Sequence, residues 1–162
     1  MVFEKNLNEK YVEIAKQVSS MIPVEWQEFY LYGEAKDGSG ETYFYFKELN
    51  SDNFIYSEEI YELYGIDEKV FDSGSYKLFQ LIGELKQIFI EDDQEPWFSI
   101  MMHVDEKFKL QIEFDYINWL ESDFGPVART KYFAHHYLGV EAKDQEEVAL
   151  FEAIEAYKES HN

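Results

Sequence analysis

Apolar residues recur at intervals of three and four in several segments of the chain, which is the spacing of an amphipathic helix. The first stripe covers residues 7–22 and stops before Pro23. A second stripe follows Ser73-Gly74-Ser75, whose last serine is available as an N-cap. A third helix is expected from Pro126 to Gly139. The last amphipathic helix carries Val148, Phe151, Ile154 and Tyr157.

Two segments rich in Tyr and Phe, residues 26–36 and 41–47, flank the sequence Asp37-Gly38-Ser39-Gly40. Glycines supply the positive φ angles of a tight reversal, so this pattern predicts a β-hairpin. Residues 53–57 are expected to add a short third strand. A helical turn is expected over residues 58–64.

A second hairpin is predicted from residues 97–104 and 108–116, joined by Asp105-Glu106-Lys107. Apolar and polar residues alternate strictly in its second strand, which predicts one buried face and one face exposed to solvent. The residues predicted to be buried are Phe108, Leu110, Ile112 and Phe114. Hairpins interspersed with helices indicate an α+β fold in which helices cover an antiparallel sheet, and the length of 162 residues predicts one domain, residues 1–162.

The net charge of the chain limits the kinds of molecule that it is expected to bind. The chain has 34 acidic and 14 basic residues and a formal net charge of −20. This field repels nucleic acids and anionic lipids but attracts basic proteins, although acidity also serves solubility alone. The chain has no cysteine, and its first residues lack the apolar run of a signal peptide. We therefore expect a cytoplasmic protein that binds neither nucleic acid nor membrane directly.

No arrangement typical of catalysis stands out, and no cofactor or metal is expected. The glycines near residue 40 lack the lysine and helix of a phosphate-binding loop. If the protein is an enzyme, the best-supported class is a metal-dependent hydrolase. Its metal site would be centred on His103, Glu113 and Asp115, which would offer one nitrogen and two oxygen ligands. A surface histidine among solvated carboxylates explains the same residues.

Acidic residues concentrate between Asp37 and Asp72, where ten carboxylates face two basic residues, and tyrosines are interspersed among them. Aromatic residues mixed with one sign of charge are typical of a protein-recognition surface. A core strand followed by an acidic helix explains the same composition, because tyrosine is also a good strand former.

An ordered set of short motifs resembles the YezG-like immunity protein family of Gram-positive bacteria. In the first half the motifs are Met21-Ile22-Pro23, Trp26, Tyr30-Leu31-Tyr32-Gly33-Glu34, Asp37-Gly38-Ser39-Gly40 and Tyr43-Phe44-Tyr45. In the second half they are Gln94-Glu95-Pro96-Trp97, Lys107-Phe108-Lys109, Phe114-Asp115-Tyr116, Pro126 with Arg129, and Tyr137-Leu138-Gly139. The segment after Gly139 departs from the family, since a proline is expected there.

The resemblance implies an immunity protein, or antitoxin, that binds and neutralises the nuclease domain of a cognate secreted toxin by stoichiometric inhibition. An acidic adaptor or DNA mimic that binds basic proteins is the alternative. Self-association into a homodimer stays open. The partner-binding residues proposed from charge and alternation are Glu41, Tyr43, Tyr45, Glu58, Glu59, Tyr61, Glu113 and Asp115.

Overall fold

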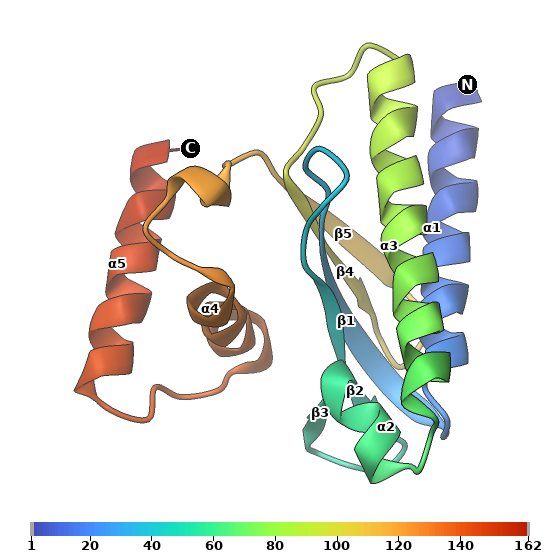
Figure 1. Ribbon diagram of the computed structural model, residues 1–162, viewed down its shortest axis with the longest axis horizontal. Coiled ribbons are helices and arrows are strands. Elements are labelled where there is room, and N and C mark those ends of the chain that lie inside the picture. The colour runs from blue at the N-terminus through green and yellow to red at the C-terminus, as the bar shows by residue number, and fades with distance from the viewer. Residues whose placement is uncertain (1, 162) are drawn as a thin grey trace. The chain divides into compact units, whose positions relative to one another are not determined.

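The structure is a computed structural model that describes residues 2–161. The chain divides into two units, Met1–Asp115 and Tyr116–Asn162. The first unit holds one antiparallel sheet with the strand order β3-β2-β1-β4-β5 (Figure 1). Its strands are β1 Trp26–Glu34, β2 Thr42–Glu48, β3 Phe54–Tyr56, β4 Ser99–Val104 and β5 Leu110–Asp115. Both predicted hairpins and the short third strand are therefore confirmed.

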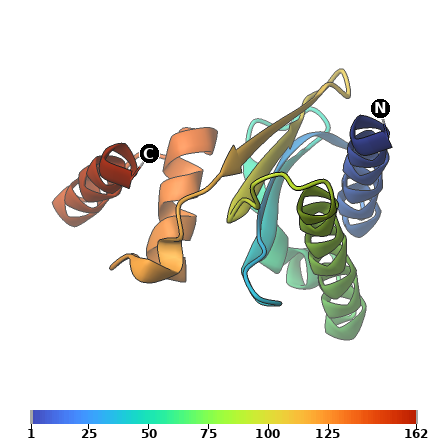
Figure 2. The ribbon, with the colours of Figure 1, turned by 90° about the horizontal axis from the view of Figure 1, so that it is seen from above.

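Two long helices, α1 Val2–Met21 and α3 Glu68–Glu91, lie side by side over one face of this sheet (Figures 1 and 2). Strand residues at alternate positions point toward them, and a Cβ added at Gly33 of β1 would lie 2.4 Å from Ile82 Cδ1 of α3. The core between helices and sheet contains Ile14, Val18, Phe29, Leu31, Phe44, Phe46, Leu78, Ile82, Leu85, Ile100 and Met102. The α+β class is confirmed.

The start of α3 corrects the sequence prediction. The helix begins at Glu68, seven residues before Ser75, and the side chain of Asp67 accepts a hydrogen bond from the Lys69 amide at 2.8 Å as its N-cap. Gly74 lies inside the helix because α1 packs closely there: a Cβ at this position would be 3.1 Å from Met21 Cγ. Gly74 therefore marks a close approach of two helices and not a boundary.

Between β3 and α3 the chain forms the 3₁₀ helix η1, Ser57–Glu59, and the short helix α2, Ile60–Leu63. This confirms the helical turn expected over residues 58–64. Gly65 follows with a φ of 66°, which a glycine adopts without strain.

The second hairpin holds one exception to the predicted alternation. Leu110, Ile112 and Phe114 pack against the core as expected. Phe108 does not, because it lies in the turn before β5 with a φ of 62°, and its side chain is 75% exposed. The turn between the strands is thus longer than the three residues predicted.

The second unit contains the 3₁₀ helix η2, Trp119–Glu121, and the helices α4, Pro126–Leu138, and α5, Gln145–His161. Both helices were predicted. Aromatic contacts hold them: the Trp119 and Tyr157 rings lie 5.2 Å apart, and the Tyr132 and Phe151 rings 6.1 Å apart. Whether the two units behave as one domain stays a prediction. No helix within residues 2–161 is long and apolar enough to cross a membrane.

Candidate partner-binding surface

The sheet face opposite α1 and α3 carries a group of tyrosines, because each of them alternates along its strand with a residue of the core. Tyr32 pairs with Tyr43 across β1 and β2, and Tyr45 pairs with Tyr56 across β2 and β3. These rings stack at centroid distances of 5.1 Å and 5.0 Å. We call this group the tyrosine face; its members are Tyr30, Tyr32, Tyr43, Tyr45 and Tyr56.

A buried carboxylate fixes the end of the first hairpin beside the tyrosine face. Glu34 is only 2% exposed, and its Oε1 accepts a hydrogen bond from the Tyr32 hydroxyl at 2.7 Å. Its Oε2 accepts a hydrogen bond from the backbone amide of Glu41 at 3.2 Å. Burial and the neighbouring Glu34 raise the pKa of Tyr32, so this hydroxyl stays protonated and keeps donating. The contacts of Glu34 thereby position Glu41.

Four carboxylates, one directly before β2, two in η1 and one in α3, lie close enough to interact with Glu58 or with Tyr56. We call them the acidic margin; they are Glu41, Glu58, Glu59 and Asp72. Although Glu58 is exposed, partial desolvation of its carboxyl group, followed by the charges of Asp72 and Glu41, raises its pKa. Burial and the charges of Glu58, Glu41 and Glu59 raise the pKa of Tyr56. The acidic margin therefore acts as one negative field, and a cation placed in it would relieve the repulsion.

Five of the predicted contact residues thus come together. Glu41, Glu58 and Glu59 are exposed. Tyr45 is half-buried, and burial together with Tyr56 and Glu59 raises its pKa. Tyr43 is only 4% exposed, and its ring contacts those of Tyr45 and Tyr56 at 6.0 Å and 5.9 Å. Tyr43 therefore supports the two neighbouring rings.

Tyr61 lies on α2 beside the acidic margin. Its ring packs against Phe71 of the core at 6.0 Å. The charges of Glu68 and Glu62, followed by burial and by Glu58 and Asp72, raise the pKa of its hydroxyl. The residue thus has its ring in the core and its hydroxyl in the same negative field.

Glu113 and Asp115 lie elsewhere on the sheet. They are on β5, at the opposite edge from β3, and pair in register with Met101 and Ser99 of β4. Strands β1 and β4 separate them from β2. The structure therefore does not join these two carboxylates to the acidic margin.

Four members of the tyrosine face and the acidic margin were not among the predicted contacts: Tyr30, Tyr32, Tyr56 and Asp72. Tyr56 follows the same alternation as Tyr43 and Tyr45, so this signal was available in the sequence. Asp72 was obscured because the helix that carries it was expected to begin later. Glu34 ends a strand directly before a turn, a pattern that does not by itself indicate a buried carboxylate.

The ligands of the hydrolase alternative do not assemble. His103 lies opposite Gln111 in register, its ring stacks on Tyr30 at 4.0 Å, and its Nε2 is 3.3 Å from Glu28 Oε2. Its carboxylate partner is therefore Glu28. Across residues 2–161 no three His, Asp or Glu side chains are grouped so that they could hold a metal ion.

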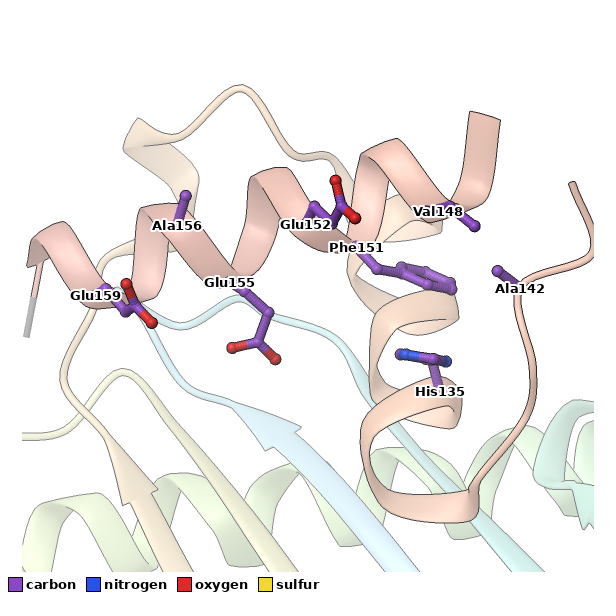
Figure 3. Close-up of a pocket in the computed structure, with 8 residues that line it drawn as sticks. All are labelled: His135, Ala142, Val148, Phe151, Glu152, Glu155, Ala156 and Glu159. Atoms are coloured by element: carbon purple, nitrogen blue, oxygen red, sulfur yellow. The ribbon is translucent and has the colours of Figure 1, made fainter. Parts of the chain in front are cut away.

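The second unit has a groove of about 430 Å³ (Figure 3). It is lined by His135, Ala142, Val148, Phe151, Glu152, Glu155, Ala156 and Glu159. His135 Nδ1 donates a hydrogen bond to the Val140 carbonyl at 2.7 Å, and its ring stacks on Phe151 at 4.4 Å. Glu155 accepts a hydrogen bond from the Tyr132 hydroxyl. His135 and Glu155 thus connect α4 with α5.

Comparison with known proteins assigns the chain to a family. The sequence profile described as "Immunity protein YezG-like" matches residues 7–152. The chain belongs to the YezG-like immunity protein family. It is 37% identical over 157 residues to the type VII secretion system protein EsaG of Staphylococcus aureus, which covers 97% of this chain and 96% of EsaG.

The chain is also similar to two Bacillus proteins named immunity protein YezG. It is 29% identical to the protein from Bacillus spizizenii over 85% of each chain, and 24% identical to that from Bacillus subtilis over 87% of this chain and 93% of the relative. The resemblance inferred from the short motifs is confirmed. Membership of an immunity protein family implies an antitoxin role.

Proposed function

We propose that this YezG-like immunity protein binds the nuclease domain of a cognate secreted toxin and neutralises it by forming a stoichiometric complex. The observation that carries the proposal is the family match over residues 7–152, together with the similarity to EsaG over 97% of the chain. A match of this extent includes both units, so the whole chain and not one fragment is expected to act.

The charge of the chain supports a nuclease as the target. A nuclease that grips a phosphate backbone presents a basic surface, and a protein of net charge −20 is attracted to it over distances of about a Debye length. The acidic margin concentrates this charge at one edge of the sheet. We expect its carboxylates to speed the encounter and to select the orientation in which the toxin docks.

Among the proposed contact residues, the structure suggests a division of roles. Glu41, Glu58 and Glu59 would pair with basic side chains of the toxin, and Tyr45 and Tyr61 would supply contact area beside them. Tyr43 would act by holding the neighbouring rings in place. Glu113 and Asp115 would form a separate contact, because they lie at the other edge of the sheet.

The proposed site of action is the cytoplasm, where an antitoxin protects the cell that makes the toxin. No cofactor is needed, since inhibition by binding requires only a complementary surface. A homodimer of the free protein would have to dissociate or to present two equivalent surfaces, and the measured masses of the free protein and of the complex distinguish these states.

The test is co-expression in bacteria with the nuclease domain of a toxin encoded nearby. We expect survival of the cells and recovery of a complex with a fixed ratio of the two chains at both low and moderate salt. An unrelated basic nuclease is the matched control, and it should remain lethal. Death of the cells with no complex would overturn the proposal, and equal capture of both nucleases only at low salt would favour the acidic adaptor instead.

A further inference from the structure

The turn between β4 and β5 presents an aromatic ring in an unusual way. Phe108 has a φ of 62°, in the left-handed region, and its side chain is 75% exposed. Bulky residues avoid this region because their Cβ crowds the backbone, whereas glycine and asparagine enter it readily. Exposure adds a second cost, since the ring remains in contact with water. A turn selected for stability alone would not place phenylalanine here.

The backbone of the turn does not depend on this side chain. Asp105 Oδ1 accepts hydrogen bonds from the amides of Lys107 and Lys109, at 2.9 Å and 2.8 Å. The Asp105 carbonyl accepts a hydrogen bond from the Phe108 amide at 2.9 Å. The amides of Lys109 and Lys107 lower the pKa of Asp105, so it stays ionised and accepts both bonds at neutral pH. Asp105 therefore fixes the left-handed residue at the tip.

Contacts within the fold cover only a small part of the Phe108 ring. Its aromatic neighbour is Trp26, edge-on at 5.8 Å. Trp26 is held independently, because its Nε1 donates a hydrogen bond to Ser19 Oγ at 3.1 Å and its ring lies 5.2 Å from that of Phe29. Phe108 thus packs against Trp26, whose position is fixed by other contacts, and most of the Phe108 ring is exposed to solvent.

We propose that Phe108 is an anchor residue that inserts into an apolar pocket of the partner toxin. This inference rests on the proposed function, because it takes the toxin domain as the partner. A rigid, pre-positioned aromatic side chain loses little entropy on binding, which is the property of residues that dominate interface energies.

The charges beside Phe108 specify the rim of that pocket. Lys107 and Lys109 flank the ring and are exposed, in a chain whose net charge is −20. The turn also holds Asp105 and Glu106, but the two lysines are the residues directly beside the ring, so the part of the rim that they contact should carry carboxylates. The tip and the acidic margin would therefore contact differently charged parts of the toxin.

The first test replaces Phe108 with asparagine, which adopts the left-handed region readily and keeps the turn. We expect the affinity for the toxin domain to fall by at least about 30-fold, as for a hot-spot residue, while the midpoint of thermal unfolding stays the same or rises. Tyr76→Asn is the control, since it removes an exposed ring from α3, and it should leave the affinity unchanged. Unchanged affinity for Phe108→Asn would overturn the proposal, and a fall in stability with no change in affinity would assign the ring a structural role.

The second test reverses the lysines. Lys107→Glu/Lys109→Glu makes the chain more acidic. If only the net charges of the two proteins determined their attraction, this variant would bind a basic toxin equally tightly or more tightly. An acidic rim predicts weaker binding, by about tenfold or more. The control is Lys5→Glu/Lys77→Glu, with the same change of charge on α1 and α3. If the wild-type protein binds no toxin, the proposed function fails; if it binds and neither tip variant weakens the complex, only the anchor inference fails.

Discussion

The two hairpins of the sheet meet a similar backbone requirement with different residues. The turn between β1 and β2 has positive φ angles at Asp37, Gly38 and Gly40, residue types that tolerate them. The turn between β4 and β5 has its positive φ at Phe108. The first turn therefore follows the rules of stable hairpins, and the second departs from them at an exposed aromatic. Departures of this kind cluster where a protein binds something, since stability alone would have removed them.

The hairpins also differ in charge. The first leads through Glu41 into the acidic margin, whereas the second carries exposed Lys107 and Lys109 on either side of its aromatic ring, with Asp105 and Glu106 before them. A field of one sign acts at a distance and mainly accelerates association, but a buried aromatic acts only after contact and mainly slows dissociation. The two hairpins are thus expected to control different steps of toxin binding.

The largest effect should come from breaking the glycine turn. A Cβ at Gly40 would lie 2.5 Å from the Glu34 carbonyl oxygen, at a φ of 145°. We expect Gly40→Ala to destabilise the protein by about 2–4 kcal/mol, measured by urea unfolding. Gly38→Ala is the control, because it has a φ of 80° but open space around it, and should cost only about 1 kcal/mol. Equal losses would show that backbone strain, and not the clash, determines the requirement for Gly40.

The next effect separates the two steps of binding. Glu58→Gln/Glu59→Gln should slow association with the toxin by about tenfold at low salt, equivalent to about 1.4 kcal/mol, with little change in the dissociation rate. Surface plasmon resonance at two salt concentrations measures both rates. The control, Glu4→Gln/Glu95→Gln, removes the same charge at a distance from the acidic margin. A change confined to the dissociation rate would refute the steering role.

Regular patterns in the sequence were sufficient for most of the fold. The stripe over residues 7–22 predicted α1, and the sequence Asp37-Gly38-Ser39-Gly40 predicted the first turn, because each depends on local backbone chemistry. The start of α3 was mispredicted since Gly74 suits either a boundary or a close helix contact. That choice depends on Met21, which is distant in sequence.

The candidate site was predictable only in part. Alternation identified Tyr43 and Tyr45, and charge density identified Glu58, but the meeting of these residues with Asp72 depends on how η1 and α3 fold back beside β2. Phe108 was predicted as a buried residue because it opens an alternating run. Whether such a run begins one residue earlier or later is determined by the turn, and here Asp105 extends it.

A smaller effect concerns the support of the second turn. Asp105→Ala removes the acceptor of two backbone amides and should lower the midpoint of thermal unfolding by less than Gly40→Ala does. The folded state lowers the pKa of Asp105 below its usual 3.8, so the stabilisation is present above pH 3.8 and is lost as the pH falls through the folded pKa. The difference between wild type and variant should therefore shrink below about pH 3.8. A difference that is constant with pH would show that the charge of Asp105 is irrelevant.

The smallest effect tests whether the acidic margin, which the first hairpin joins at Glu41, lowers the stability of the free protein. Partial desolvation and the charges of Asp72 and Glu41 raise the pKa of Glu58 above 4.5, so the protonated carboxyl is favoured in the folded state. The corresponding stability is fully present below pH 4.5 and is lost as the pH rises through the folded pKa.

Glu58→Gln should therefore stabilise the free protein at pH 7, by about a few tenths of a kcal/mol because solvent screens this exposed group, and should make no difference at pH 4. Urea unfolding at the two pH values measures this, with Glu4→Gln as the control. A variant less stable than wild type at pH 7 would contradict the repulsion inferred for the acidic margin. The expected result would give the acidic margin and the second hairpin one property in common: each keeps a group that the free protein would be more stable without, a repulsive charge in the margin and a left-handed aromatic residue in the hairpin.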